Sequence, residues 1–186
     1  MFGHYIFYVE KNIKRGKIMN KILSCDQSTT CSGISCFING QYQWTKLVDL
    51  KKEKDSELRF KHMVTSMYKI IEKEKPDEIV FEQTAFQSNA KTLRMLSQLQ
   101  GCIIGKCFEL DIPYYILEPS KWRKTVGIEQ GKKTRTSLKF ESLNLAHELF
   151  SKELTEDAAE SALIGCAHLI LNHHATMEDF SGEDLF

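Results

Sequence analysis

The sequence predicts an α/β fold in which helices cover both faces of one mixed five-stranded sheet. Three observations support this prediction. Short strand-like segments near the N-terminus are joined by polar turns, as in an antiparallel meander. Farther along, strands alternate with helices, which implies parallel pairing through crossover connections. The chain has 186 residues, of which 42% are hydrophobic, and this suits one domain with its own core.

The first half of the chain supplies the predicted meander. A strand over residues 22–26 ends in Asp26, and a second strand alternates over residues 33–38. Asn39-Gly40 is the strongest short hairpin signal in the sequence, and it leads into a third strand over residues 41–50. These three strands are therefore expected to be neighbours in the sheet.

The remaining elements alternate between helices and strands. Apolar residues recur at helical spacing between Leu58 and Ile71, which predicts a helix that Pro76 ends. A buried-type strand follows, and it again ends in an acid, Glu82. Helices are predicted over residues 56–75, 89–110, 119–126, 132–150 and 155–173, and strands over residues 78–82 and 114–117.

The two ends of the chain differ from this core region. We expect residues 1–18 to be an upstream extension before a natural start at Met19, with a genuine basic arm or added strand as the alternative. Residues 19–174 form the predicted domain, and residues 175–186 form an acidic tail. A disordered solvating tail is the favoured interpretation. The last residues, Asp184-Leu185-Phe186, resemble the acidic tip of bacterial single-strand binding proteins, which would make the tail a docking peptide for a partner.

Composition argues against several classes of protein. Lys plus Arg and Asp plus Glu both total 25, so the formal net charge is zero, unlike a uniformly basic nucleic-acid coat or a highly charged disordered chain. The chain lacks a run of 18 apolar residues, so no membrane span is expected, and we expect no signal peptide. The six cysteines form no CxxC pair, which predicts buried free thiols and a cytoplasmic, reducing compartment.

Four carboxylates stand at suggestive places. Asp26 and Glu82 each end a strand, where open α/β sheets bind ligands. Asp157 and Glu160 share one face of the last helix, and the small residues between and after them would let that helix approach the sheet closely. Converging carboxylates repel one another, and a divalent cation such as Mg²⁺ removes that repulsion. The alternative is that Asp157 and Glu160 are solvated first-turn acids favoured by the helix dipole.

These segments resemble the three acidic motifs of RuvC-type Holliday-junction resolvases. The sequence looks more like the resolvases of bacteriophages than like the bacterial housekeeping enzyme. The segments that carry the resemblance are Ile22-Leu23-Ser24-Cys25-Asp26, Ile79-Val80-Phe81-Glu82-Gln83 and the helix from Glu156 to Leu163. The basic segment from Pro119 to Gly127 resembles that family as well. The resemblance implies a ribonuclease H-like fold, a homodimer and Mg²⁺-dependent paired nicking of branched DNA by a metal-activated water. It also implies that Asp26, Glu82, Asp157 and Glu160 are the catalytic residues and hold two Mg²⁺ ions, which Mn²⁺ can replace. Two departures stand out: Glu160 replaces the family's usual Asp, and Gln27-Ser28 replaces its usual Pro-Gly.

A basic stretch accompanies these acids. Between Lys121 and Lys139 there are seven basic residues, and only Glu129 opposes them, so the local charge is +6. By resemblance, Arg123 and Lys133 are the strongest DNA-contact candidates, followed by Lys132, Lys121 and Lys124, and Phe86 would engage unstacked bases. The alternatives are a solvated helix face for the lysines and a core position for Phe86. Trp122 is expected in the core, and His168 and His173 are expected to pack rather than to bind metal.

Two other functions remain open at this point. Asp26-Gln27-Ser28-Thr29-Thr30 also resembles the phosphate-binding turn of sugar kinases and actin-like ATPases, although the chain has no later Asp-x-Gly-Gly segment. A non-catalytic junction-binding protein on the same fold is the second alternative.

A dimer interface could come from the leucine- and isoleucine-bearing helix over residues 89–110, which could equally be ordinary core. If the protein is encoded by a phage, the host cytoplasm is the expected compartment.

Overall fold

The computed structural model describes residues 20–84, 89–172 and 174–180. The expected extension over residues 1–18 lies outside this described part. The strands are β1 (Lys21–Asp26), β2 (Cys31–Ile38), β3 (Gln41–Asp49), β4 (Glu78–Glu82) and β5 (Tyr114–Leu117). The helices are α2 (Ser56–Glu74), α3 (Ala90–Glu109), α4 (Pro119–Thr125), α5 (Arg135–Phe150), α6 (Glu156–Leu171) and the 3₁₀ turn η1 (Glu178–Phe180).

The five strands form one mixed sheet in the order β3-β2-β1-β4-β5. Strands β1, β2 and β3 pair antiparallel, and β4 and β5 extend the sheet in parallel with β1. Asn39 and Gly40 join β2 to β3 with positive φ angles of 54° and 83°. That geometry is the hairpin turn that an Asn-Gly pair favours. The predicted fold class, a mixed five-stranded sheet with helices on both faces, is confirmed.

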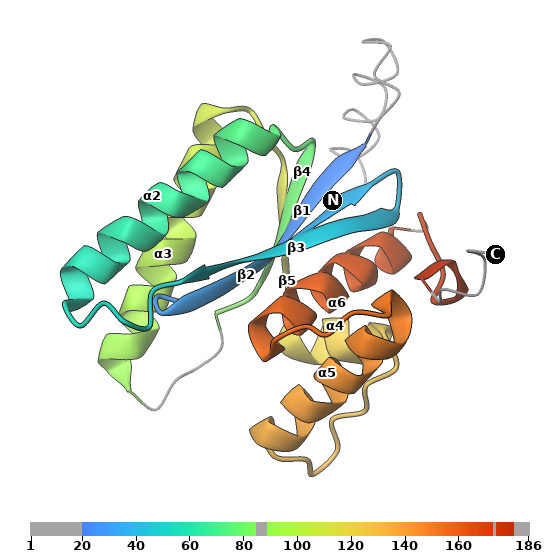
Figure 1. Cartoon of the computed structure of the whole chain (residues 1–186). Helices are drawn as coiled ribbons and strands as arrows, with labels where there is room; N and C mark the ends of the chain where they lie inside the picture. The colour runs from blue at the N-terminus through green and yellow to red at the C-terminus, as the bar shows by residue number, and fades with distance from the viewer. Residues whose placement is uncertain (1–19, 85–88, 173, 181–186) are drawn as a thin grey trace.

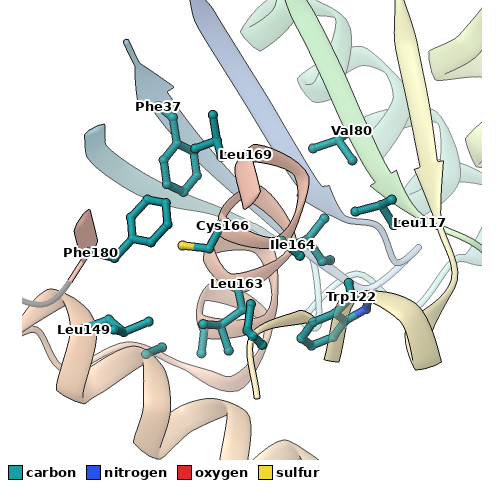
Figure 2. Packing of buried hydrophobic residues seen from close by; sticks show 14 of the residues in the cluster. Phe37, Val80, Leu117, Trp122, Leu149, Leu163, Ile164, Cys166, Leu169 and Phe180 are labelled. Carbon is teal, nitrogen blue, oxygen red and sulfur yellow. The ribbon is translucent and has the colours of Figure 1, made fainter. Parts of the chain in front are cut away.

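Helices cover both faces of the sheet (Figure 1), and a hydrophobic core lies on each face. On one face, α2 and α3 cover alternate strand residues such as Leu23, Cys25 and Ile34. On the other face, α4, α5 and α6 cover the complementary set, which includes Ile22. Phe37 and Val80 belong to the same set (Figure 2). Alternate residues of a strand point to opposite faces, so each strand contributes to both cores. The six cysteines are free and five are buried, as expected.

Two elements begin two or more residues away from their predicted starts. Strand β2 begins at Cys31 rather than at residue 33, because the hydroxyl of Ser32 bonds back to the Ser28 carbonyl oxygen and closes the polar turn earlier. Helix α5 begins at Arg135 rather than at residue 132, because Thr134 is its N-cap and accepts a hydrogen bond from the Ser137 backbone N–H at 3.2 Å. The basic residues before Thr134 therefore belong to a loop. In the part of the chain described, no helix is long and apolar enough to cross a membrane.

The predicted disordered tail is wrong for residues 175–180, which pack against the domain. Phe180 in η1 retains only 6% exposure and packs edge-on against Phe37, with ring centroids 6.3 Å apart (Figure 2). Met177 packs against the same core. The acidic composition of the tail concealed these two apolar anchors, whose burial outweighs the entropy of ordering a short segment. The proposed docking peptide, Asp184-Leu185-Phe186, lies outside the described residues.

Phe180→Ala is expected to lower the free energy of unfolding by about 3 kcal/mol, because it removes a buried ring from the core. For a chain of this size, that corresponds to a melting temperature lower by roughly 6–12 °C. Thermal unfolding followed by circular dichroism measures the change. Phe140→Ala is the matched control, because Phe140 is 63% exposed on α5. Equal melting temperatures for the two variants would show that the tail does not stabilise the domain.

Candidate active site

Two acids meet at one edge of the sheet because β1 and β4 are parallel neighbours. Cys25 pairs with Phe81, so the residues that follow, Asp26 and Glu82, leave the sheet side by side. Both side chains are partly buried. The backbone carbonyl oxygen of Glu82 accepts hydrogen bonds from the side-chain amides of Gln27 at 2.8 Å and Gln100 at 3.0 Å. These contacts hold the end of β4 in place beside β1.

Helix α6 brings the other two acids to the same edge, and small residues allow its close approach. Gly33 pairs with Asp26 across the sheet, and a Cβ on Gly33 would overlap the carbonyl oxygen of Asp157. Ser24 Oγ donates to the carbonyl oxygen of Ser161 at 2.7 Å. Farther along α6, a Cβ on Gly165 would lie 2.7 Å from Ser24 Oγ. The predicted close contact between this helix and the sheet is confirmed.

The acids influence one another strongly. Burial raises the pKa of Asp26 well above its usual range, and the charges of Glu82, Glu160 and Asp157 raise it further, in that order. Burial also raises the pKa of Glu82, against the lowering effect of a hydrogen bond from Trp122. The four carboxylates therefore form one electrostatic cluster, as their positions in the sequence predicted.

Two basic side chains enter this cluster. Arg123 Nη2 donates to Glu160 Oε1 at 2.7 Å and lies 3.6 Å from Glu82 Oε1. Lys139 Nζ lies 3.0 Å from Glu156 Oε2 and 3.9 Å from Asp157 Oδ1. Trp122 is fully buried, as expected for a core residue, but its indole N–H also donates to Glu82 Oε1 at 3.0 Å.

The acids open onto a cavity of about 890 Å³ with basic residues on both sides. One side carries Arg123 with Arg135 and Lys139 of α5. The opposite side carries Lys51 after β3, Arg59 of α2 and Lys91 of α3, which the sequence did not identify as binding residues. These three residues come from separate segments of the chain, so no single basic run marked them together. Lys52 and Lys54 follow Lys51, but Glu53 and Asp55 offset their charge.

The structure separates the sequence-predicted DNA contacts. Arg123 lies at the acids, whereas Lys121, Lys124, Lys132 and Lys133 do not line the cavity. All four are exposed, and Lys133 also pairs with Glu141 at 2.7 Å. Phe86 lies outside the described residues, as does His173. His168 is buried and bonds through Nε2 to Glu78 Oε2 at 3.1 Å, so it packs as expected. Arg135 and Lys139 belong to the basic stretch over residues 121–139, although they are not among the contacts that the resemblance implies.

The donor set suits a hard divalent cation. Four carboxylates supply the oxygen ligands that Mg²⁺ prefers, and the buried Gln27 Oε1 has no hydrogen-bond partner among the described residues. No three His, Cys, Asp or Glu side chains of residues 20–84, 89–172 and 174–180 converge tightly enough to hold a metal as they stand. Glu160 and Asp157 face Arg123 and Lys139 instead. The donor chemistry fits a metal, and in this structure two of the acids lie against basic side chains.

The strand order and the two helical layers define the ribonuclease H-like fold class. The structure of Thermus thermophilus RuvC in complex with a Holliday junction substrate shares this fold, with a TM-score of 0.63 at 12% identity, over 84% of this chain and 97% of that one. RuvC of Caldicellulosiruptor saccharolyticus is 21% identical over 156 residues, which cover 81% of this chain and 92% of that protein. RuvC of Bacteroides fragilis is 27% identical over 109 residues, which cover 56% of this chain and 58% of that protein.

The family model for the crossover junction endodeoxyribonuclease RuvC matches residues 28–168. The chain therefore belongs to the RuvC family. The matched range contains Glu82, Asp157 and Glu160, and it begins two residues after Asp26.

Proposed function

We propose that this protein is a structure-selective endodeoxyribonuclease that cuts four-way DNA junctions and related branched DNA by paired nicks. One observation carries the proposal: four carboxylates from β1, β4 and α6 form a single electrostatic cluster at the mouth of a cavity with basic sides. Membership of the RuvC family makes junction DNA the expected substrate.

Asp26, Glu82, Asp157 and Glu160 are the proposed catalytic and metal-holding residues. The RuvC family depends on divalent metal ions in general, and we propose two Mg²⁺ ions, with Mn²⁺ as a substitute. When bound, such ions activate water and stabilise the leaving oxygen of a phosphodiester. Glu82 is oriented by Trp122, whose indole N–H donates to Glu82 Oε1 at 3.0 Å. Glu160 is longer than the family's usual Asp and can still reach a metal.

The two sides of the cavity are the proposed path of the DNA backbone. Arg123, Arg135 and Lys139 on one side and Lys51, Arg59 and Lys91 on the other can neutralise phosphates around the acids. Lys121, Lys124, Lys132 and Lys133 are outer contacts in this proposal, for junction arms that extend beyond the cavity. Phe86 remains the proposed residue for stacking on an unpaired base.

A symmetric homodimer would supply two matched active sites for paired nicks. Helix α3 offers a suitable face. Gly101 and Gly105 lie one helical turn apart, and a Cβ on either would meet no atom within 4 Å. Phe108, one turn farther on, is 71% exposed. Small residues beside an exposed aromatic suit close packing against a second copy of α3.

Gly105→Leu is expected to weaken the dimer at least ~10-fold, because a branched side chain would hold the two helices apart. Analytical ultracentrifugation measures the dimer dissociation constant. Thr65→Leu on the exposed face of α2 is the matched control. Unchanged dimerisation of the Gly105 variant would rule out this face as the interface.

The proposed function is tested with purified protein and a four-way junction labelled on each strand in turn. Symmetric paired nicks that need Mg²⁺ support the resolvase. Mobility shifts without nicks in Mg²⁺ or Mn²⁺ would favour the non-catalytic junction-binding protein. Turnover of ATP without nicking would favour the sugar-kinase-like or actin-like alternative, whose phosphate turn would be residues 26–30.

Three finer assignments also belong to this proposal. A bacteriophage origin is suggested by the Gln27-Ser28 pair and by the low identity to the bacterial relatives. The host cytoplasm is then the working compartment. The end of the acidic tail, Asp184-Leu185-Phe186, is proposed as a docking site for a protein partner.

A further inference from the structure

Arg123 occupies a position that suits a metal ion better than it suits a surface DNA contact. Its side chain is 12% exposed, and its partner Glu160 is 5% exposed, so the pair is largely withdrawn from water. The same guanidinium lies 3.6 Å from Glu82. Two acids from different elements thus share one positive charge at the centre of the cluster.

The contacts of Arg123 are incomplete in this position. Its Nε is buried and has no hydrogen-bond partner among the described residues. A buried donor without a partner is unfavourable, and a guanidinium that is bidentate on an oxyanion would satisfy it better. The position therefore relieves repulsion among the acids without satisfying the arginine fully.

The ring of Trp122 lies against the guanidinium of Arg123. Arg123 Cζ is 4.4 Å from the centre of the Trp122 ring, and Trp122 is anchored to Glu82 by its indole N–H. Cation–π attraction over a ring face has no directional donor geometry. The guanidinium can therefore turn away from the acids while it stays on the ring.

We propose that the Arg123 guanidinium neutralises the acids when no metal is bound, and that a divalent metal displaces it. The displaced guanidinium then becomes available to a DNA phosphate. A metal and Arg123 compete for Glu160 and Glu82, because two like charges at the same carboxylates repel each other. Metal loading and the phosphate contact are thereby coupled: the arginine is free to meet DNA only when the acids have another cation. This inference rests on the proposed function in one respect, that these acids hold the metal.

The first test measures Mn²⁺ binding by isothermal titration calorimetry with no DNA present. Arg123→Gln is expected to bind Mn²⁺ about tenfold more tightly than the natural protein, because the competing cation is gone. Arg123→Lys keeps the charge and should stay near the natural affinity. Arg94→Gln is the matched control, an exposed arginine of α3 that does not line the cavity, and should change the affinity less than about twofold. Equal or weaker Mn²⁺ binding by Arg123→Gln would overturn the proposal.

A second measurement does not depend on an Arg123 variant folding. In a Trp44→Phe background, Trp122 is the remaining tryptophan. Its emission should change on saturation with Mg²⁺, because the guanidinium turns over the ring and Glu82, the hydrogen-bond acceptor of the indole N–H, gains a different cation. Emission that is identical with and without saturating Mg²⁺ would contradict displacement.

The third measurement tests the coupling to DNA. Junction affinity is measured against salt concentration in Ca²⁺ and in EDTA, for the natural protein and Arg123→Gln. The substitution should lower the slope of log affinity against log salt by about 0.9 in Ca²⁺, one phosphate contact, and leave it unchanged in EDTA. Equal losses in both conditions would show that Arg123 meets phosphate regardless of metal. None of the three measurements uses cleavage, so a protein that binds metal as expected and never nicks a junction would refute the proposed function alone.

Discussion

Asp26→Asn is expected to reduce junction cleavage by ~10³-fold or more while junction binding in Ca²⁺ is retained. Asp26 ends β1 at the centre of the acidic cluster, and the other three carboxylates all act on it. An amide cannot replace the charge that holds a divalent metal, and metal assistance contributes several kcal/mol to phosphodiester hydrolysis. Single-turnover cleavage of a labelled four-way junction measures the rate, and mobility shifts measure the binding.

The same substitution is expected to stabilise the metal-free protein at neutral pH. Burial and three acidic neighbours raise the pKa of Asp26 in the folded state above its unfolded value of ~3.9. The folded state then holds this proton at a pH where the unfolded state has released it. Stability from this carboxyl is therefore fully present below about pH 4 and is lost as the pH rises through the raised pKa.

Asn cannot ionise, so the variant should lack that loss and melt at a higher temperature in EDTA near neutral pH. A gain of ~1 kcal/mol would raise the melting temperature by about 2–4 °C for a chain of this length. Asp49→Asn, at the exposed end of β3, is the matched control and should leave both cleavage and melting unchanged. A variant that still nicks junctions at the natural rate would remove Asp26 from the proposed catalytic set.

The sequence could predict the sheet and the meeting of the acids because both depend on local patterns. Alternation marked β2, Asn39-Gly40 marked the turn, and parallel pairing of β1 with β4 places Asp26 next to Glu82. The approach of α6 was predictable from small residues such as Ala158 and Ser161. The catalytic roles themselves stay predictions.

Other features depend on how distant elements pack, and no local pattern encodes them. Arg123 could be assigned to a basic segment, but its contact with Glu160 follows from the packing of α4 against α6. Lys51, Arg59 and Lys91 come from three elements, and only the tertiary fold places them on one side of the cavity. Phe180 looked like part of a charged tail because its neighbours are acidic, although the ring fits beside Phe37.

Gly33→Ala is expected to lower the free energy of unfolding by about 1–3 kcal/mol and to slow cleavage by roughly 10²-fold. An added Cβ on Gly33 would overlap the carbonyl oxygen and carbon of Asp157. These are backbone atoms, which cannot rotate aside as the end of a flexible side chain can. The start of α6 must therefore move away from β2, and Asp157 and Glu160 move with it. Chemical denaturation measures the stability, and single-turnover cleavage measures the rate.

The measurement that isolates this displacement is Mn²⁺ affinity, because a loss of stability alone would not change metal binding in the folded population. Gly33→Ala should weaken Mn²⁺ binding, since two of the four carboxylates shift relative to Asp26 and Glu82. Thr65→Ala is the matched control: Thr65 is exposed on α2 and does not line the cavity, and alanine favours a helix more than threonine does, so this variant should keep the natural Mn²⁺ affinity and be at least as stable as the natural protein. If Gly33→Ala bound Mn²⁺ as tightly as the natural protein, the position of α6 would not set the geometry of the acids. The assignment of Asp157 and Glu160 to the metal site would then lose its structural basis.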